Sequence, residues 1–163
     1  MEGKPVRESR SEYSELALPN DANGLGNVLG GKVMHLVDLA AAMAALRHAR
    51  TPVVTAAVDS MQFIHPVRIG QLIVLRSSVN RVFRTSMEVG VQVETENLLT
   101  GEKLHTCSAY LTFVALDKAG KATPAPPVIP ETEEEKRRYR EAGERRENRL
   151  ALRTRLKGTS MAD

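Results

Sequence analysis

The stretch "KVMHLVDLAAAMAALRHAR", from Lys32 to Arg50, decides the fold of this 163-residue chain. Alanine, leucine and methionine favour a helix, and Pro52 lies just beyond its end. Apolar residues occur nearly all round this helix, which is typical of a helix buried in a core. The sequence therefore predicts one central helix, with Asp38 as the polar residue that interrupts it.

Segments rich in β-branched residues surround this helix and are separated by short turns. In 86–97 the pattern alternates, with Met87, Val89, Val91 and Val93 on one face. Consecutive strands joined by short turns are antiparallel neighbours. The expected strands cover 12–18, 53–64, 71–82, 86–97 and 103–117. The predicted class is α+β, with a strongly twisted antiparallel sheet wrapped round the one central helix.

The ends of the chain differ from this middle part. We expect residues 1–11 to form a flexible N-terminus, 12–118 the main domain, 119–130 a Pro-rich connector, and 131–163 a charged helix and tail. The tail starts acidic and ends basic, which suits the helix dipole, and Thr132 is a candidate N-cap. A solvated helix is the simpler interpretation of this segment, and an oligomer contact is the alternative.

The composition excludes several kinds of partner. A formal net charge of +3 is too weak to argue for nucleic acid. No apolar run reaches the length of a membrane span, and the first residues lack the apolar region of a secretory signal. The single cysteine, Cys107, rules out an intramolecular disulfide and fits a reducing compartment. We therefore expect a cytoplasmic protein.

The loop "GNVLGGKVM", Gly26 to Met34, falls one residue short of a phosphate-binding P-loop. Val33 stands where that loop needs a Ser or Thr hydroxyl for Mg²⁺, and no alternation of parallel strands and helices follows. We reject nucleotide hydrolysis on these grounds. The glycines can instead bring the unpaired N–H groups of a helix N-terminus close to a carbonyl oxygen, as in an oxyanion hole, with Gly31 as the donor. A tight turn into the helix is the commoner explanation of a Gly-Gly pair.

Asp38 needs an explanation because an unpaired buried carboxylate costs several kcal/mol, about 3–5 when a partner is lost. It must be solvated, hydrogen-bonded across an interface, or functional. His35 lies three residues before it, but no further His, Cys or acid completes a coordination set, so we expect no metal.

Together these segments resemble the acyl-CoA thioester hydrolases of the hotdog fold, the branch that includes brain acyl-CoA hydrolase and its short bacterial relatives. The resemblance covers roughly residues 12–150. It is carried by the spacing N-x(6)-GG-x(6)-D in "NDANGLGNVLGGKVMHLVD", and by F-x-x-PV-x-x-G, "TSMEV" and "TFVALD".

The resemblance implies acyl-CoA hydrolysis at sites formed by pairs of domains, one bringing Asn23 and the other Asp38. It also implies that Gly30 and Gly31 bind the thioester, and that Arg84, Thr85 and Ser86 contact coenzyme A. No cofactor is implied beyond the coenzyme A of the substrate. The expected assembly is a homodimer that assembles further into a hexamer, a trimer of dimers.

Two alternatives stay open at this point. A hotdog enoyl-CoA hydratase resembles a different motif, with a catalytic His and Asp close together, and no such pair is evident on the right element. A non-catalytic acyl-CoA-binding protein gains nothing from a carboxylate such as Asp38 beside a thioester. The residues leave the acyl-chain length open, and also whether Asp38 is a general base or a nucleophile.

Overall fold

A computed structural model describes residues 1–160 of the chain, with the side chain of Ser160 left out. One five-stranded antiparallel sheet has the order β2-β4-β5-β6-β3. Its strands are β2 (Ser11–Leu16), β3 (Val53–Phe63), β4 (Leu72–Val82), β5 (Ser86–Glu96) and β6 (Lys103–Ala115). The predicted α+β class and the antiparallel sheet are confirmed.

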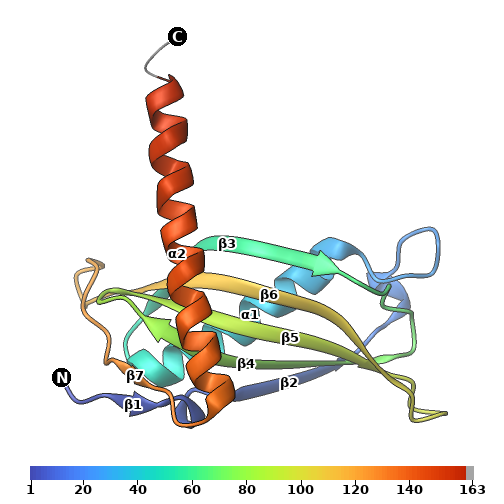
Figure 1. The fold of residues 1–163 in the computed structure, drawn as a ribbon. Coiled ribbons are helices and arrows are strands. Elements are labelled where there is room, and N and C mark those ends of the chain that lie inside the picture. The colour runs from blue at the N-terminus through green and yellow to red at the C-terminus, as the bar shows by residue number, and fades with distance from the viewer. Residues whose placement is uncertain (161–163) are drawn as a thin grey trace.

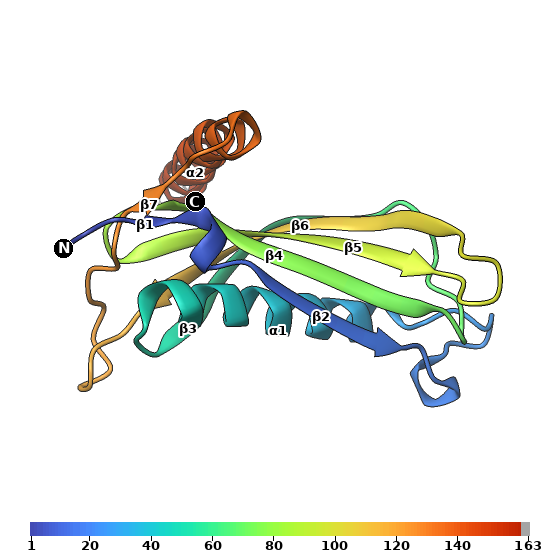
Figure 2. The ribbon, with the colours of Figure 1, turned by 90° about the horizontal axis from the view of Figure 1, so that it is seen from below.

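Two helices lie on opposite faces of this sheet (Figures 1 and 2). The central helix α1 (Gly30–Ala49) runs along the inner face, and the long helix α2 (Glu133–Ser160) crosses the outer face. Helix α1 begins at Gly30, two residues earlier than the sequence pattern suggested. Within residues 1–160, no helix is long and apolar enough to cross a bilayer.

The core lies between α1 and the inner face of the sheet. The expected inward residues of β5 are all buried, as are most of the alanines along α1: Met87, Val89, Val91 and Val93; Ala40, Ala41, Ala44 and Ala45. Small alanine side chains let the helix approach the sheet closely, which suits a core with few aromatic residues.

The N-terminal segment differs from the flexible end that we expected for residues 1–11. A short strand β1 (Lys4–Pro5) pairs in parallel with β7 (Val128–Ile129), and a 3-10 turn, η1 (Val6–Glu8), follows it. Ser9 is fully buried; its hydroxyl donates to Val6 O at 2.7 Å and accepts from Val79 N at 2.9 Å. A polar sequence is ordered here because the Ser9 hydroxyl bonds to the backbone of Val6 and Val79, and the backbone of β1 pairs with β7. β7 also lies within the expected connector.

Helix α2 is held against the sheet rather than solvated all round. Thr132 is its N-cap: the Thr132 hydroxyl accepts from Glu135 N at 3.1 Å, and the Glu135 carboxylate accepts from the backbone of Glu131 and Thr132. Farther along, Arg145 donates two hydrogen bonds to the buried carboxylate of Glu88 on β5, at 2.7 and 3.0 Å. The simpler interpretation of a solvated helix is therefore wrong for its sheet-facing side.

The two edges of the sheet are unequal. β2 is short and carries Glu12 and Glu15, which discourage pairing with another chain. β3 has 11 residues, and its outer edge has no strand partner among the described residues. Val54, Val58 and Phe63 of β3 are exposed. A long apolar edge of this kind is a ready template for a further strand.

Candidate active site

Asp38 lies near the middle of α1 and is half-buried on the side that faces β3. Its Oδ1 accepts a 2.7 Å hydrogen bond from the Thr55 hydroxyl on β3. The carboxylate is thus oriented, and its other oxygen has no hydrogen-bond partner within residues 1–160. Sequence reasoning missed Thr55, because a threonine in a strand is ordinary and carries no signal of function.

Asn23 lies in the loop before α1 and is half-buried. Its Oδ1 accepts from Leu25 N at 2.9 Å and from Asn27 N at 3.2 Å, so the side chain is fixed within its own loop. These two bonds leave the amide nitrogen Nδ2 as the group that can donate to a ligand, and no acceptor for it occurs in the described chain. Asn27, its near neighbour in sequence, bonds to Asn23 through its backbone N and O atoms.

The glycine-rich loop is pinned to the rest of the domain by its backbone. Val28 N donates to Val67 O at 2.7 Å, and Leu29 N donates to Asp21 O at 2.8 Å. Lys32 does not point to a phosphate site, because its ammonium lies 3.0 Å from the Glu15 carboxylate. Glu15 raises the pKa of Lys32, and Lys32 lowers the pKa of Glu15. With these contacts and an antiparallel sheet, this loop does not have the structure of a P-loop.

Gly30 and Gly31 form the first turn of α1. The first amides that bond within the helix are those of Lys32 and Val33, which donate to Leu29 O, so the two glycine N–H groups precede them. A Cβ placed on Gly31 would meet no atom within 4 Å, so the space beside it is open. Seven residues separate Gly31 from Asp38, or about 10 Å along a helix.

The turn between β4 and β5 carries Arg84, Thr85 and Ser86. Arg84 is exposed and has a positive φ of 85°, while its carbonyl oxygen accepts from Ala125 N at 2.8 Å. The Thr85 carbonyl accepts a hydrogen bond from Ala115 N. Ala115 is the residue of β6 that pairs with Val53 at the start of β3. The Ser86 hydroxyl accepts from Arg146 of α2 at 3.2 Å. Ser86 is thus already engaged on the outer face.

Within one chain the expected residues lie in three places: at each end of the sheet and between the two ends. Asn23, Gly30 and Gly31 lie where α1 begins, beside the end of β3 (Figure 1). The β4–β5 turn lies beside the start of β3, at the end of the molecule where α1 terminates. Asp38 and Thr55 lie between the two ends. No hydrogen bond in the described chain joins Asn23 to Asp38.

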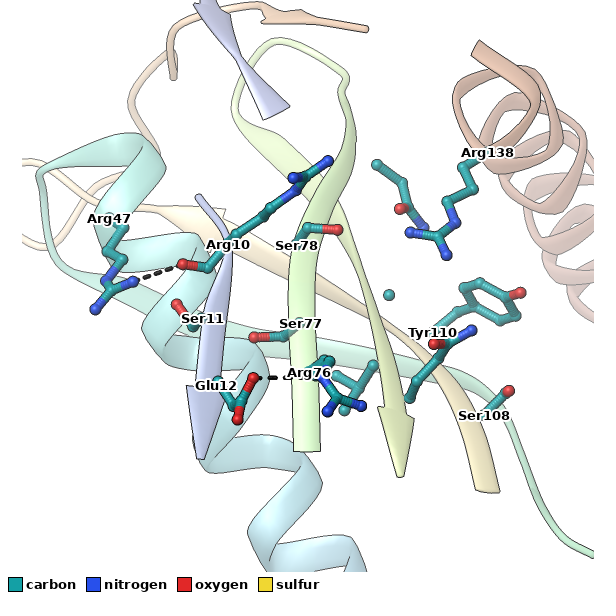
Figure 3. Close-up of a pocket in the computed structure, with 14 residues that line it drawn as sticks. Arg10, Ser11, Glu12, Arg47, Arg76, Ser77, Ser78, Ser108, Tyr110 and Arg138 are labelled. Carbon is teal, nitrogen blue, oxygen red and sulfur yellow. Dashed lines mark hydrogen bonds and ion pairs between the residues drawn. The ribbon is translucent and has the colours of Figure 1, made fainter. Parts of the chain in front are cut away.

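A cavity of about 670 Å³ lies elsewhere, on the outer face of the sheet beside α2 (Figure 3). Arginine and serine side chains from several elements line it, among them Arg10, Arg76, Ser78 and Arg138. It includes none of the residues expected from the sequence. No cluster of His, Cys, Asp or Glu within residues 1–160 has the arrangement of a metal site.

Comparison with known proteins agrees with this architecture. The family model described as "Thioesterase superfamily" matches residues 25–102. The acyl-CoA thioester hydrolase YkhA of Bacillus subtilis is 43% identical over 129 residues, covering 79% of this chain and 75% of YkhA. A solved structure described as an apo-hexameric acyl-CoA thioesterase is 45% identical, with a TM-score of 0.91 over 93% of this chain and 97% of its own.

A twisted antiparallel sheet around one helix, with these relatives, defines the hotdog fold. The chain belongs to the thioesterase superfamily, among its acyl-CoA thioester hydrolases.

The acyl-CoA hydrolase of Staphylococcus aureus, solved with butyryl coenzyme A and coenzyme A, is 36% identical, with a TM-score of 0.89 over 96% of this chain and 95% of its own. Variants of that enzyme with alanine in place of an asparagine, an aspartate or a threonine have also been solved. Those three positions are 15 and 17 residues apart. Asn23, Asp38 and Thr55 have the same separations in this chain.

Proposed function

We propose that this chain hydrolyses acyl-CoA to a fatty acid and coenzyme A at sites shared by two copies. The observation that carries the proposal is the carboxylate of Asp38, oriented by Thr55 at 2.7 Å beside an unpaired strand edge. The matching separations in the Staphylococcus aureus variants support Asn23, Asp38 and Thr55 as site residues.

Pairing two copies through β3 would bring the separate groups of residues together. An antiparallel pair centred on Val58, the middle residue of β3, sets Val53 of one copy opposite Phe63 of the other. Within a chain, the Phe63 ring lies 3.9 Å from the position of a Cβ on Gly30. The start of α1 and the Asn23 loop of one copy therefore come alongside Val53–Thr55 of the other, near its Asp38.

Exposed apolar residues on both elements suit such a contact. Met34 and Leu39 of α1 are 48% and 41% exposed, and α1 packs against β3, whose Val54 and Val58 are exposed as well. Exposed apolar side chains gathered on two neighbouring elements suit an interface. We further propose that such dimers assemble into a hexamer, as described for one of the relatives.

The chemistry follows from the groups in this shared site. The N–H of Gly31 at a helix N-terminus polarises the thioester carbonyl and stabilises the oxyanion that develops. Asp38 acts as general base on a water, or attacks the carbonyl carbon directly. The amide nitrogen of Asn23 donates to the water or the carbonyl. When water attacks, Asp38 takes its proton, the coenzyme A thiolate leaves and is protonated in turn, and the acyl group is released as the free acid. When Asp38 attacks, loss of the thiolate leaves an acyl–Asp38 anhydride, which water then hydrolyses to the free acid and the regenerated carboxylate.

We place the coenzyme A moiety at the β4–β5 turn of the copy that supplies Asp38. Arg84 is exposed, and no carboxylate pairs with it among the described residues, so it can meet a phosphate. The Thr85 carbonyl accepts a hydrogen bond from Ala115 N at the end of β6, which fixes the turn. Ser86 is the weaker of the three candidates, since Arg146 already occupies its hydroxyl. The lone buried Cys107 suits work in the reducing cytoplasm.

A thiol-release assay across short to long acyl-CoA esters tests the proposal. The wild-type protein should release coenzyme A from at least one chain length, and Asp38→Asn should lower kcat by about 10²–10⁴-fold. The variant should remain folded, because the amide is nearly isosteric and can still accept from Thr55. An inactive wild type across all lengths, or an Asp38→Asn variant with normal turnover, would refute the proposal.

A further inference from the structure

Helix α2 is longer than the sheet that it crosses. It passes over the strands on the outer face and then continues beyond β3, the edge strand (Figure 1). Its last hydrogen bonds to the sheet come from Arg149, whose Nη1 lies 2.7 and 2.8 Å from the Asp59 carboxylate oxygens on β3. The following residues, 150–160, have no sheet of their own chain beneath them.

The spacing of the contacts fixes how the helix crosses the strands. Tyr139 lies over β4, where the Arg81 guanidinium stacks 4.3 Å from its ring, and Arg149 lies over β3. Ten helical residues advance about 15 Å. Three strand spacings, from β4 to β3, measure about 14 Å. The helix therefore runs nearly at right angles to the strands and passes one strand about every three residues.

The side of α2 that faces the sheet continues past the edge and becomes apolar there. Ala142, Arg145 and Arg149 face the sheet, and the same spacing of three and four residues leads to Leu152 and Leu156. These leucines are 45% and 58% exposed. A strand added beyond β3 would lie beneath Leu152, and the next strand beneath Leu156, about 5 and 10 Å farther on.

We propose that the projecting end of α2, residues 150–160, docks on a second copy of this chain, over the outer face of that copy's β3 and β6. This rests on the pairing of two copies through β3 put forward under the proposed function. That pairing supplies the strands that Leu152 and Leu156 would cover. By two-fold symmetry, α2 of each copy then packs on the sheet of the other copy. The two α2 helices run antiparallel across the β3–β3 interface.

The charges on α2 fit this arrangement. The segment 150–160 carries Arg153, Arg155 and Lys157 and no acid, whereas Glu144 and Glu147 are exposed and make no ion pair within residues 1–160. The two-fold axis lies half a strand spacing beyond β3, about one to two helical residues past Arg149. Because the two α2 helices run antiparallel, a residue a given distance before this point in one copy lies beside the residue the same distance after it in the other copy. Lys157 of one copy is thus level with Glu144 of the other, and Arg153 is level with Glu147.

Cysteine labelling of the full-length chain tests the docking directly. Cys107 is buried, and burial raises the pKa of its thiol. This native thiol therefore reacts slowly with maleimide and adds little to the measured labelling. Leu152→Cys and Leu156→Cys place a thiol on the sheet-facing side, and Ala151→Cys places one on the opposite side as the matched control. Each maleimide reaction rate is divided by the rate in the unfolded variant. We expect both sheet-facing thiols to react at least about tenfold more slowly than the control.

Sedimentation of the same samples and loss of thioester absorbance complete the test. Equal labelling rates in a protein that sediments as a dimer or as a hexamer overturn the docking, as does a protein that stays monomeric. Protection that appears only with vesicles of anionic lipid would overturn it in favour of a membrane surface. If the thiols are unprotected and the protein still hydrolyses acyl-CoA, the docking is wrong and the proposed function stands. If the thiols are protected and the protein does not hydrolyse acyl-CoA, the proposed function is wrong and the docking stands.

The dissociation constant of the dimer, measured for variants that place a charge on α2, gives a second and independent test. The double variant Leu152→Glu/Leu156→Glu should raise the dissociation constant of the dimer at least about tenfold, since buried leucines would become charged. Ala151→Glu should leave that constant unchanged. An unchanged constant in the double variant would contradict the docking.

Discussion

The Thr55 hydroxyl on the edge strand donates a 2.7 Å hydrogen bond to Oδ1 of Asp38 on the central helix. This contact joins the two elements that a second copy would meet, and it sets the direction of the carboxylate. Orientation of a catalytic group is worth several kcal/mol when the geometry is close to that of attack, up to about 7–11.

Thr55→Val should therefore lower kcat about 10- to 100-fold with a smaller effect on KM, because a hydrogen bond to a charged group contributes about 1.5–3 kcal/mol. Steady-state kinetics measure this. Thr112→Val is the matched control: the Thr112 hydroxyl is buried with no partner among the described residues. Replacing it should leave turnover unchanged and stability equal or higher. Normal kcat in Thr55→Val would remove Thr55 from the site.

Gly31→Ala should separate stability from activity. A Cβ at this position meets no atom of its own chain within 4 Å, and alanine is up to about 1 kcal/mol better than glycine in a helix. The melting temperature should hold or rise. The methyl group would intrude on the thioester beside the Gly31 N–H, so kcat should fall. If activity and stability both stay at wild-type levels, the carbonyl does not bind there.

Arg84→Glu should mainly raise KM for acyl-CoA, because it removes ground-state binding of the phosphates at the β4–β5 turn. The effect should shrink as salt is added. Lys118→Glu, an exposed charge reversal in the turn after β6, controls for net charge. An equal rise in KM in both variants would assign the effect to the overall field rather than to Arg84.

Much of the fold could be predicted from the sequence. The apolar character of residues 32–50 and the alternation of 86–97 depend on local periodicity, and the structure has both elements where the patterns indicate. The order of residues 1–11 could not be predicted in this way. Ser9 is polar in sequence, yet its bonds to Val6 and Val79 are formed only when the chain has folded.

The site was harder to predict than the fold. Asp38 stood out because a carboxylate in an apolar helix demands a partner, but that partner, Thr55, comes from a strand 17 residues later. The contacts of α2 with the sheet could not be predicted, for a related reason. Its composition is charged, yet its arginines reach buried acids such as Glu88, which no local pattern reveals.

The central claim is that each active site takes Asn23 from one copy and Asp38 from the other. Mixing Asn23→Ala chains with Asp38→Ala chains tests it most directly, with each parent inactive alone and mixed dimers isolated by two different tags. A mixed dimer retains one site with both wild-type residues, so an equal mixture should recover about a quarter of wild-type turnover. Isolated mixed dimers that remain as inactive as either parent would contradict a site shared between copies.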